Sequence, residues 1–149
     1  FPVGLNEGQN VTLGAFTLYG IPASHNTIEK DENGRCKYMG YVVAFGNYTI
    51  YHSGDTLWFD EMPAMLKPFG IDVALLPING NKPERKVAGN LDAAEAVKLG
   101  RLLGVKRLIP CHYDMFTFNT ADVNDFINAD KKAGQPYKVL GPGERFDYP

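Results

Sequence analysis

An almost unbroken apolar run, Ile71–Ile78, limits what this chain can fold into more than any other segment. Its length suits a strand, and a strand that is apolar on both sides is typical of a parallel sheet covered on both faces. A helix is predicted over 90–104 and a further strand over 105–110. The helix has one predicted buried face, in which apolar or small residues recur at helical spacing: Ala93, Ala96, Val97, Gly100 and Leu103.

Two short segments before this run predict a hairpin. Tyr41–Phe45 and Tyr48–Tyr51 are rich in β-branched and aromatic residues, and Gly46-Asn47 between them is a two-residue turn signal. Further upstream, 11–21 predicts one strand, with Gly14 and Gly20 as bends or bulges.

The remaining segments complete the expected fold. A short helix or pair of turns is predicted over 57–69, broken by Pro63 and Pro68. Asn90 is the expected N-cap of the central helix, and Thr120 that of a last helix. Two short strands are expected over 137–140 and 145–148. A hairpin followed by strand, helix, strand, helix and strand predicts an α/β layer with its helices on one side.

Composition narrows the possible classes of protein and of binding partner. The 149 residues suit one domain, and we treat residues 1–149 as a single unit. A formal net charge of −2 gives no electrostatic reason to expect nucleic acid as a partner, and no run of sequence suggests a membrane. Two cysteines do not make a disulfide framework, so a cytoplasmic location is expected.

A carboxylate follows directly on the hairpin. The strand ending at Tyr51 runs into His52-Ser53-Gly54, and this small-residue turn holds Asp55 out from the strand tip. Sheet-based α/β proteins usually keep their chemistry at such tips. The alternative is that Asp55 caps the next helix.

Two histidines occupy equivalent positions. His25 and His112 each follow a predicted strand end, as Asp55 does. Two imidazoles and a carboxylate suit zinc, manganese or iron. A purely structural role for all three remains open, and His52 is expected to pack or support the site rather than to bind metal.

Several motifs resemble the second half of metallo-β-lactamase-fold hydrolases. They are Tyr51–Thr56, Ile71–Pro77, Leu91–Ala96 and Leu108–Asp114. Within that superfamily they are most similar to the L-ascorbate-6-phosphate lactonase-like branch, and they also approach the N-acyl-phosphatidylethanolamine phospholipase D branch.

The resemblance implies half of an αββα sandwich, a mixed sheet with helices on its outer face, and up to two divalent metals, zinc or manganese, at one sheet edge. By that resemblance His25 is a ligand of the first metal and His112 of the second, and Asp55 bridges both. A bridging carboxylate can hold one cation on each oxygen and offset their repulsion, and metal-activated water would then attack the substrate.

One departure matters. The family carries a His-x-His-x-Asp-His cluster in its first half, but this sequence has only three histidines and no such cluster. We therefore expect either a C-terminal half or a lost site, and the start at Phe1 favours a C-terminal half. The inner sheet face should then need a cover, either the missing N-terminal half or a second copy of the chain.

Weaker candidates surround this set. Tyr113 could orient His112 or touch the substrate, and Asn79, Lys82 and Arg85 could meet an anionic substrate, although a solvated loop is the alternative. The expected activity is hydrolysis of a small ester, lactone or phosphorylated sugar-acid. The alternatives are a phosphodiesterase and a non-catalytic module that has lost the metal site.

Overall fold

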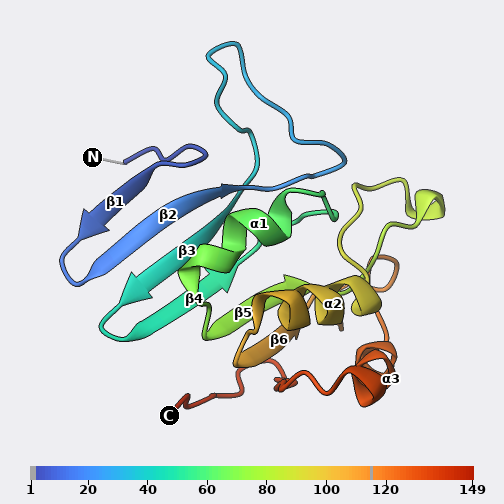
Figure 1. The fold of residues 1–149 in the computed structure, drawn as a ribbon. Helices are drawn as coiled ribbons and strands as arrows, with labels where there is room; N and C mark the ends of the chain where they lie inside the picture. The colour runs from blue at the N-terminus through green and yellow to red at the C-terminus, as the bar shows by residue number, and fades with distance from the viewer. Residues whose placement is uncertain (1–2, 115) are drawn as a thin grey trace.

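A single mixed sheet organises the computed structural model, which describes residues 3–114 and 116–149. Within those residues the sheet has six strands, which lie side by side in chain order (Figure 1). Strands β1 to β4 are antiparallel, whereas β4, β5 and β6 are parallel. The strands are β1 (Asn10–Leu13), β2 (Phe16–Pro22), β3 (Met39–Phe45), β4 (Tyr48–His52), β5 (Val73–Pro77) and β6 (Arg107–Cys111).

The first predicted strand is wrong in one respect, because 11–21 forms a hairpin of β1 and β2. The chain reverses at Gly14-Ala15, where Gly14 has a φ of 60°, a left-handed conformation that glycine adopts without strain. Gly20 is not a bulge, since it pairs in regular register with Tyr41. The predicted hairpin of β3 and β4 is confirmed.

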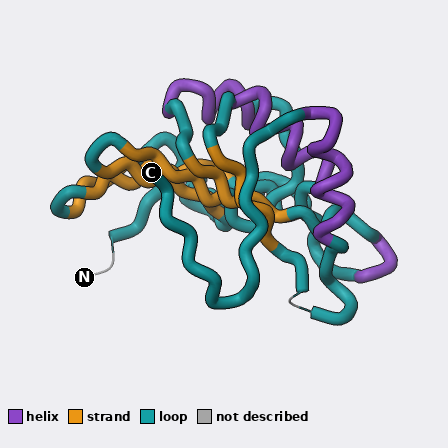
Figure 2. The backbone as a smooth tube through the Cα atoms, turned by 90° about the horizontal axis from the view of Figure 1, so that it is seen from below, coloured by secondary structure: helices purple, strands orange, loops and turns teal. Residues whose placement is uncertain are grey.

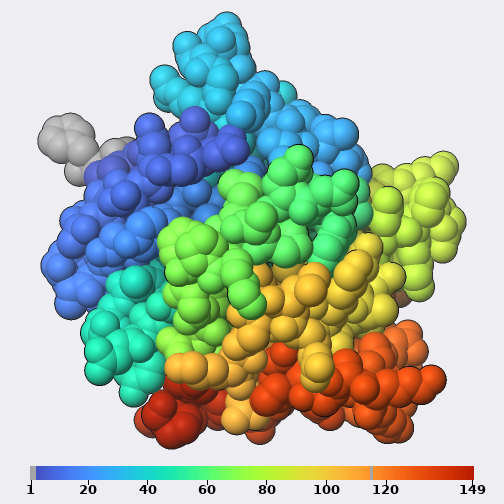
Figure 3. Space-filling model, in the orientation of Figure 1, coloured from blue at the N-terminus to red at the C-terminus, as the bar shows by residue number. Residues whose placement is uncertain are grey.

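The helices α1 (Met62–Leu66), η1 (Lys67–Phe69), α2 (Ala93–Leu103) and α3 (Val123–Ala133) lie on one side of the sheet, as predicted, and Figure 2 shows them together there. The short 3-10 helix η2 (Pro83–Arg85) lies apart from them, in the loop between β5 and α2. In the space-filling view the helical layer forms a continuous surface, from which the loop carrying η2 projects at the right (Figure 3).

Three predictions at the helix ends are wrong. Pro63 lies in the first turn of α1, where its missing N–H costs nothing, and so it begins the helix instead of breaking it. Asp92, and not Asn90, caps α2, in a reciprocal capping box with Glu95. Asp122 in place of Thr120 caps α3.

The core lies between the sheet and the helices. One row of paired residues crosses four strands of this face, and all four side chains are fully buried: Val42, Tyr51, Ala74 and Leu108. The predicted inner face of α2 is confirmed, because all five of its residues are buried in the same layer. The helical layer therefore fixes the sheet, and with it the strand ends that carry His25, Asp55 and His112.

The opposite face, which we call the open face, is apolar and only partly covered. Leu18, Val43 and Ile50 form one half-buried row across β2, β3 and β4. Phe16 and Tyr48, in a neighbouring row, are 47% and 40% exposed. Apolar surface of this kind is uncommon on a finished protein surface unless a partner covers it.

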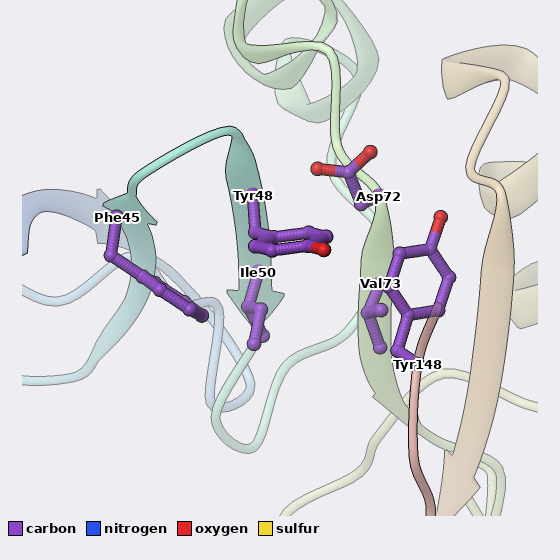
Figure 4. Close-up of a pocket in the computed structure, with 6 residues that line it drawn as sticks. All are labelled: Phe45, Tyr48, Ile50, Asp72, Val73 and Tyr148. Atoms are coloured by element: carbon purple, nitrogen blue, oxygen red, sulfur yellow. The ribbon is translucent and has the colours of Figure 1, made fainter.

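The C-terminal segment crosses part of the open face, but not as the two strands predicted. Tyr137 makes an isolated bridge to Leu108, and residues 145–148 pair with no strand. Tyr148 stands over Val73 and packs edge-on against Tyr48, with ring centroids 5.9 Å apart (Figure 4). Together they border a small apolar hollow of about 170 Å³.

Candidate metal centre

Asp55 is held at the end of β4 by a turn that requires glycine. Gly54 has a φ of 63°, and a side chain there would bring its Cβ to 2.7 Å from the Met39 carbonyl oxygen. Asp55 does not cap a helix, since α1 begins at Met62 after Glu61. Its side chain, 47% exposed, is therefore free to bind other groups.

His112 faces one oxygen of Asp55. It follows β6 with a φ of 63°, an unusual conformation for a residue with a Cβ, and such conformations concentrate at functional sites. Its Nε2 lies 3.2 Å from Asp55 Oδ1. The strained backbone thus turns the imidazole toward the tip of β4.

His25 faces the other oxygen. It lies three residues beyond the end of β2, and its Nε2 is 3.9 Å from Asp55 Oδ2. The Tyr38 ring packs on the imidazole with centroids 4.6 Å apart. The structure therefore brings together the three side chains that the sequence placed at strand ends, with the carboxylate between the two imidazoles.

The donor set fits part of a two-metal site. Each Asp55 oxygen has one imidazole nitrogen beside it, an arrangement that suits one cation on each side of a bridging carboxylate. In residues 3–114 and 116–149, no three His, Cys, Asp or Glu side chains are arranged to hold one ion. Each cation would have two protein donors, one Asp55 oxygen and one imidazole nitrogen. This number is below the usual coordination number, so further ligands are needed.

Thr56 and Asn90 support this set, and neither was predicted as a site residue. The fully buried Thr56 hydroxyl accepts from the Ser24 backbone N–H at 2.9 Å, beside His25. Asn90 Nδ2 lies 3.3 Å from His112 Nδ1. Thr56 already stood within the sequence motif, but its contact spans 32 residues and is not readable from local pattern.

His52 points to the open face beside the site. Its Nδ1 accepts the Gly54 backbone N–H at 3.0 Å, so it helps to shape the turn. Burial lowers the pKa of the His52 imidazole, the His112 ring acts in the same direction, and the Asp55 carboxylate opposes both.

Tyr113 does not point a free hydroxyl at the site. Its oxygen donates to the Leu140 carbonyl and accepts the Leu140 N–H at 3.1 Å, and burial raises the pKa of the phenol. Next to it, a shallow cleft of about 350 Å³ is lined by His52, His112 and the 140–142 turn. Burial raises the pKa of the Cys111 thiol, also in this cleft, to about 11.

The candidates for binding an anionic substrate, Asn79, Lys82 and Arg85, lie in the segment that follows β5. Asn79 is buried and donates to Asn119 at 2.8 Å, and the Arg85 guanidinium donates to the Asn79 and Thr120 carbonyls, each at 2.7 Å. Lys82 lines a separate cleft that also carries several carboxylates. The anion-binding role of these residues stays a prediction.

None of the helices in the described part of the chain is long and apolar enough to cross a bilayer.

Comparisons with known proteins agree with this architecture. The family described as "Beta-lactamase superfamily domain" matches residues 2–113. A UPF0173 metal-dependent hydrolase of Rubrobacter xylanophilus is 34% identical over 147 residues, which cover 94% of this chain and 58% of that protein. A UPF0173 metal-dependent hydrolase of Carboxydothermus hydrogenoformans is 32% identical over 144 residues, 94% of this chain and 60% of the relative.

Solved structures give the same picture. Igni18, a metallo hydrolase from Ignicoccus hospitalis, superimposes with a TM-score of 0.77 at 28% identity, over 99% of this chain and 61% of that one. An isothiocyanate hydrolase from Delia radicum gut bacteria shares the fold at 14% identity, with a TM-score of 0.75 over 95% of this chain and 57% of its own. The chain thus spans about 60% of the length of the relatives it matches. It has the α/β metallo-β-lactamase fold and belongs to the beta-lactamase superfamily.

Proposed function

We propose that this chain forms part of a metal-dependent hydrolase in which Asp55 bridges two divalent metal sites. The observation that carries the proposal is that the two Asp55 oxygens each face a different imidazole, at 3.9 and 3.2 Å. His25 with Asp55 Oδ2 would hold one ion, and His112 with Asp55 Oδ1 the other. The names of the relatives, metal-dependent hydrolases, support the same reading.

The residues present suit zinc or manganese, because both accept imidazole and carboxylate ligands. A divalent metal, when bound, supplies a water nucleophile at near-neutral pH. Asp55 would place negative charge between the two cations and so lower their mutual repulsion. The cleft beside His112 is where a small substrate would bind, with Tyr113 holding the 140–142 turn as its wall.

The remaining ligands would come from outside residues 1–149. We treat this chain as a single domain that forms the C-terminal half of the hydrolase, since its relatives are longer and the donor set is incomplete. The open face supports the same proposal, because its apolar rows would pack against the N-terminal half or against a second copy of the chain. The two free thiols, Cys36 and Cys111, support a cytoplasmic location.

The substrate proposed is a small ester, lactone or phosphorylated sugar-acid. The same metals could act on phosphorus, so the assay compares lactones with bis-aryl phosphates in the natural full-length protein. Lactone turnover that is lost with a chelator and restored by zinc or manganese supports the proposal, whereas turnover of the phosphate diester alone would reassign the substrate class.

Metal analysis of the same protein separates an enzyme from a non-catalytic module. We expect zinc, manganese or iron to copurify in proportion to protein. A full-length protein that takes up none of these metals would exclude the hydrolase and leave the module.

A further inference from the structure

Asn90 is a buried amide at the edge of the candidate metal centre. It is 2% exposed, and its Nδ2 lies 3.3 Å from His112 Nδ1. Its Oδ1 is also buried, and it has no hydrogen-bond partner within the described parts of the chain. A buried acceptor left unpaired lowers stability, so this side chain needs an explanation beyond packing.

The backbone on either side of this amide is fixed. The Asn90 N–H donates to the Gly80 carbonyl at 3.2 Å, and the Leu91 N–H donates to the Thr56 carbonyl at 2.7 Å, next to Asp55. Asn90 is therefore tied to the same turn that carries the carboxylate. Because the side chain is buried, rotation about its last side-chain bond is the movement that exchanges the two amide atoms without displacing the rest of the side chain.

The present orientation fits a metal-free His112. If the Asn90 amide donates to Nδ1, the ring proton of the neutral imidazole must lie on Nε2. That proton then points at Asp55 Oδ1, 3.2 Å away. In this tautomer the Nε2 lone pair is not available to a metal.

Metal binding through Nε2 requires the opposite arrangement. The proton must then sit on Nδ1, and metal-bound histidines almost always donate this second N–H to an acceptor. A half-turn of the Asn90 amide exchanges Nδ2 for Oδ1 and supplies that acceptor at the same place. An amide can serve both tautomers, because it carries a donor and an acceptor of nearly the same shape.

We propose that Asn90 is a positioning residue for His112, whose amide reverses when the ring changes from its Asp55-bound to its metal-bound tautomer. The proposal rests on the proposed function for its metal-bound state, whereas its metal-free state can be tested alone. In the metal-bound state, the Asn90 Oδ1 that is now unpaired accepts the hydrogen bond from His112 Nδ1–H.

The test uses three variants of the natural full-length protein. Asn90→Leu keeps the approximate volume and removes both hydrogen-bonding groups. Asn90→Asp keeps the acceptor and removes the donor. Gln135→Leu removes another buried amide, 3% exposed and bonded to the Val105 carbonyl, and serves as the control for lost stability.

Two measurements are made on each variant. Nitrogen-15 NMR of the histidine rings, at alkaline pH where they are neutral, reports which His112 nitrogen carries the proton. Competition with a chromophoric chelator reports the affinity for Zn²⁺ alone.

We expect the wild-type ring to carry its proton on Nε2 without metal and on Nδ1 with it. Asn90→Asp should move the proton to Nδ1 even without metal and keep Zn²⁺ affinity equal or tighter. Asn90→Leu should weaken Zn²⁺ binding roughly 10- to 100-fold. Gln135→Leu should lower the unfolding midpoint and leave both the tautomer and the affinity unchanged.

Other outcomes overturn the proposal. Equal losses of affinity in Asn90→Asp and Asn90→Leu would indicate a merely structural role, and wild-type affinity in Asn90→Leu would remove the role altogether. If the wild-type protein binds no Zn²⁺, the proposed function fails, and the metal-free spectra decide this inference. If the wild-type ring carries its proton on Nε2 and Asn90→Asp moves it to Nδ1, the Asn90 contact is supported. If the proton does not move in this variant, the contact is contradicted.

Discussion

Two aspartates, Asp55 and Asp72, allow metal binding to be separated from structure at the level of single residues. Asp72 is buried, accepts the Thr49 N–H at 2.7 Å and pairs with the Lys106 ammonium at 2.6 Å. Asp55 instead faces the two imidazoles from a half-exposed position.

We therefore predict opposite effects for the two alanine variants. Asp55→Ala should lose most bound metal with little change in stability. Asp72→Ala should keep its metal but lose about 1–3 kcal/mol of unfolding free energy, because the Thr49 N–H is left unpaired. Metal content and chemical denaturation measure the two effects, and equal metal content in both variants would refute the assignment of Asp55.

Thr56 tests how the His25 segment is positioned. Its hydroxyl accepts from the Ser24 N–H and donates to the Leu57 carbonyl at 2.8 Å. Thr56→Val keeps the shape but leaves the Ser24 N–H unpaired, so we predict a loss of about 1–3 kcal/mol and weaker metal binding. Thr56→Ser keeps both bonds and should retain the affinity. Similar affinities in the two variants would mean that this hydroxyl does not position His25.

The proposed metal ligands and the residues that support them differ in how far sequence alone predicts them. His112 directly follows β6, and His25 and Asp55 lie three residues beyond β2 and β4, so local pattern is enough to single them out. Asn90 carried a plausible local role as a helix cap, but Asp92 takes that role and Asn90 turns inward to His112. Such contacts depend on the tertiary arrangement, which no short window of sequence contains.

Among the elements, the close approach of β3 to the Asp55 turn is the most sensitive feature. A Cβ at Gly40 would come within 2.5 Å of the Ser53 carbonyl oxygen. We predict that Gly40→Ala costs about 1–3 kcal/mol, the usual range for overpacking, and weakens metal binding by displacing the turn. Gly4→Ala, where a Cβ would meet nothing within 4 Å, is the matched control. Denaturation curves that coincide for the two variants would contradict the expectation.

The capping box at the start of α2 stabilises a single element of the fold. Asp92 Oδ1 accepts the Glu95 N–H at 2.8 Å, and Glu95 Oε2 accepts the Asp92 N–H at 3.0 Å. Asp92→Ala should lower the unfolding free energy by about 1 kcal/mol without affecting metal binding. A change in metal affinity as large as that of Asp55→Ala would contradict the assignment of Asp92 as a cap alone.

The elements were easier to predict than their limits. The strands from β3 onward and the buried face of α2 follow from apolar periodicity. The split of 11–21 into two strands was missed because a Gly-Ala turn is a weak signal compared with Gly46-Asn47. The C-terminal strands were wrong because only Tyr137 pairs with the sheet, through an isolated bridge to Leu108, and the end of the chain packs by its side chains, as Tyr148 does on Tyr48.

For the whole molecule, the open face makes a prediction about association. Val43 and Ile50 lie side by side in a half-buried apolar row. We predict that the 149-residue chain alone self-associates, and that Val43→Glu or Ile50→Glu reduces its average mass in light scattering, because a charge must stay in water. Leu102→Glu, at a residue 46% exposed on α2, should leave the mass unchanged. A wild-type chain that is monomeric at every concentration would argue strongly against a covered face.

The agreement of spatial and chain order in the sheet also bears on how the molecule is made. Each strand finds its partner in the segment synthesised just before it, so the sheet can grow by one strand at a time as the chain leaves the ribosome. Among the strands of the described residues, none has to wait for a later one to be inserted beside it. The contact between Asp55 and His112 joins the ends of β4 and β6, which are not neighbours in the sheet, and so it forms only after β6 has docked. Metal bound at the proposed site would therefore be acquired late in the biogenesis of this protein.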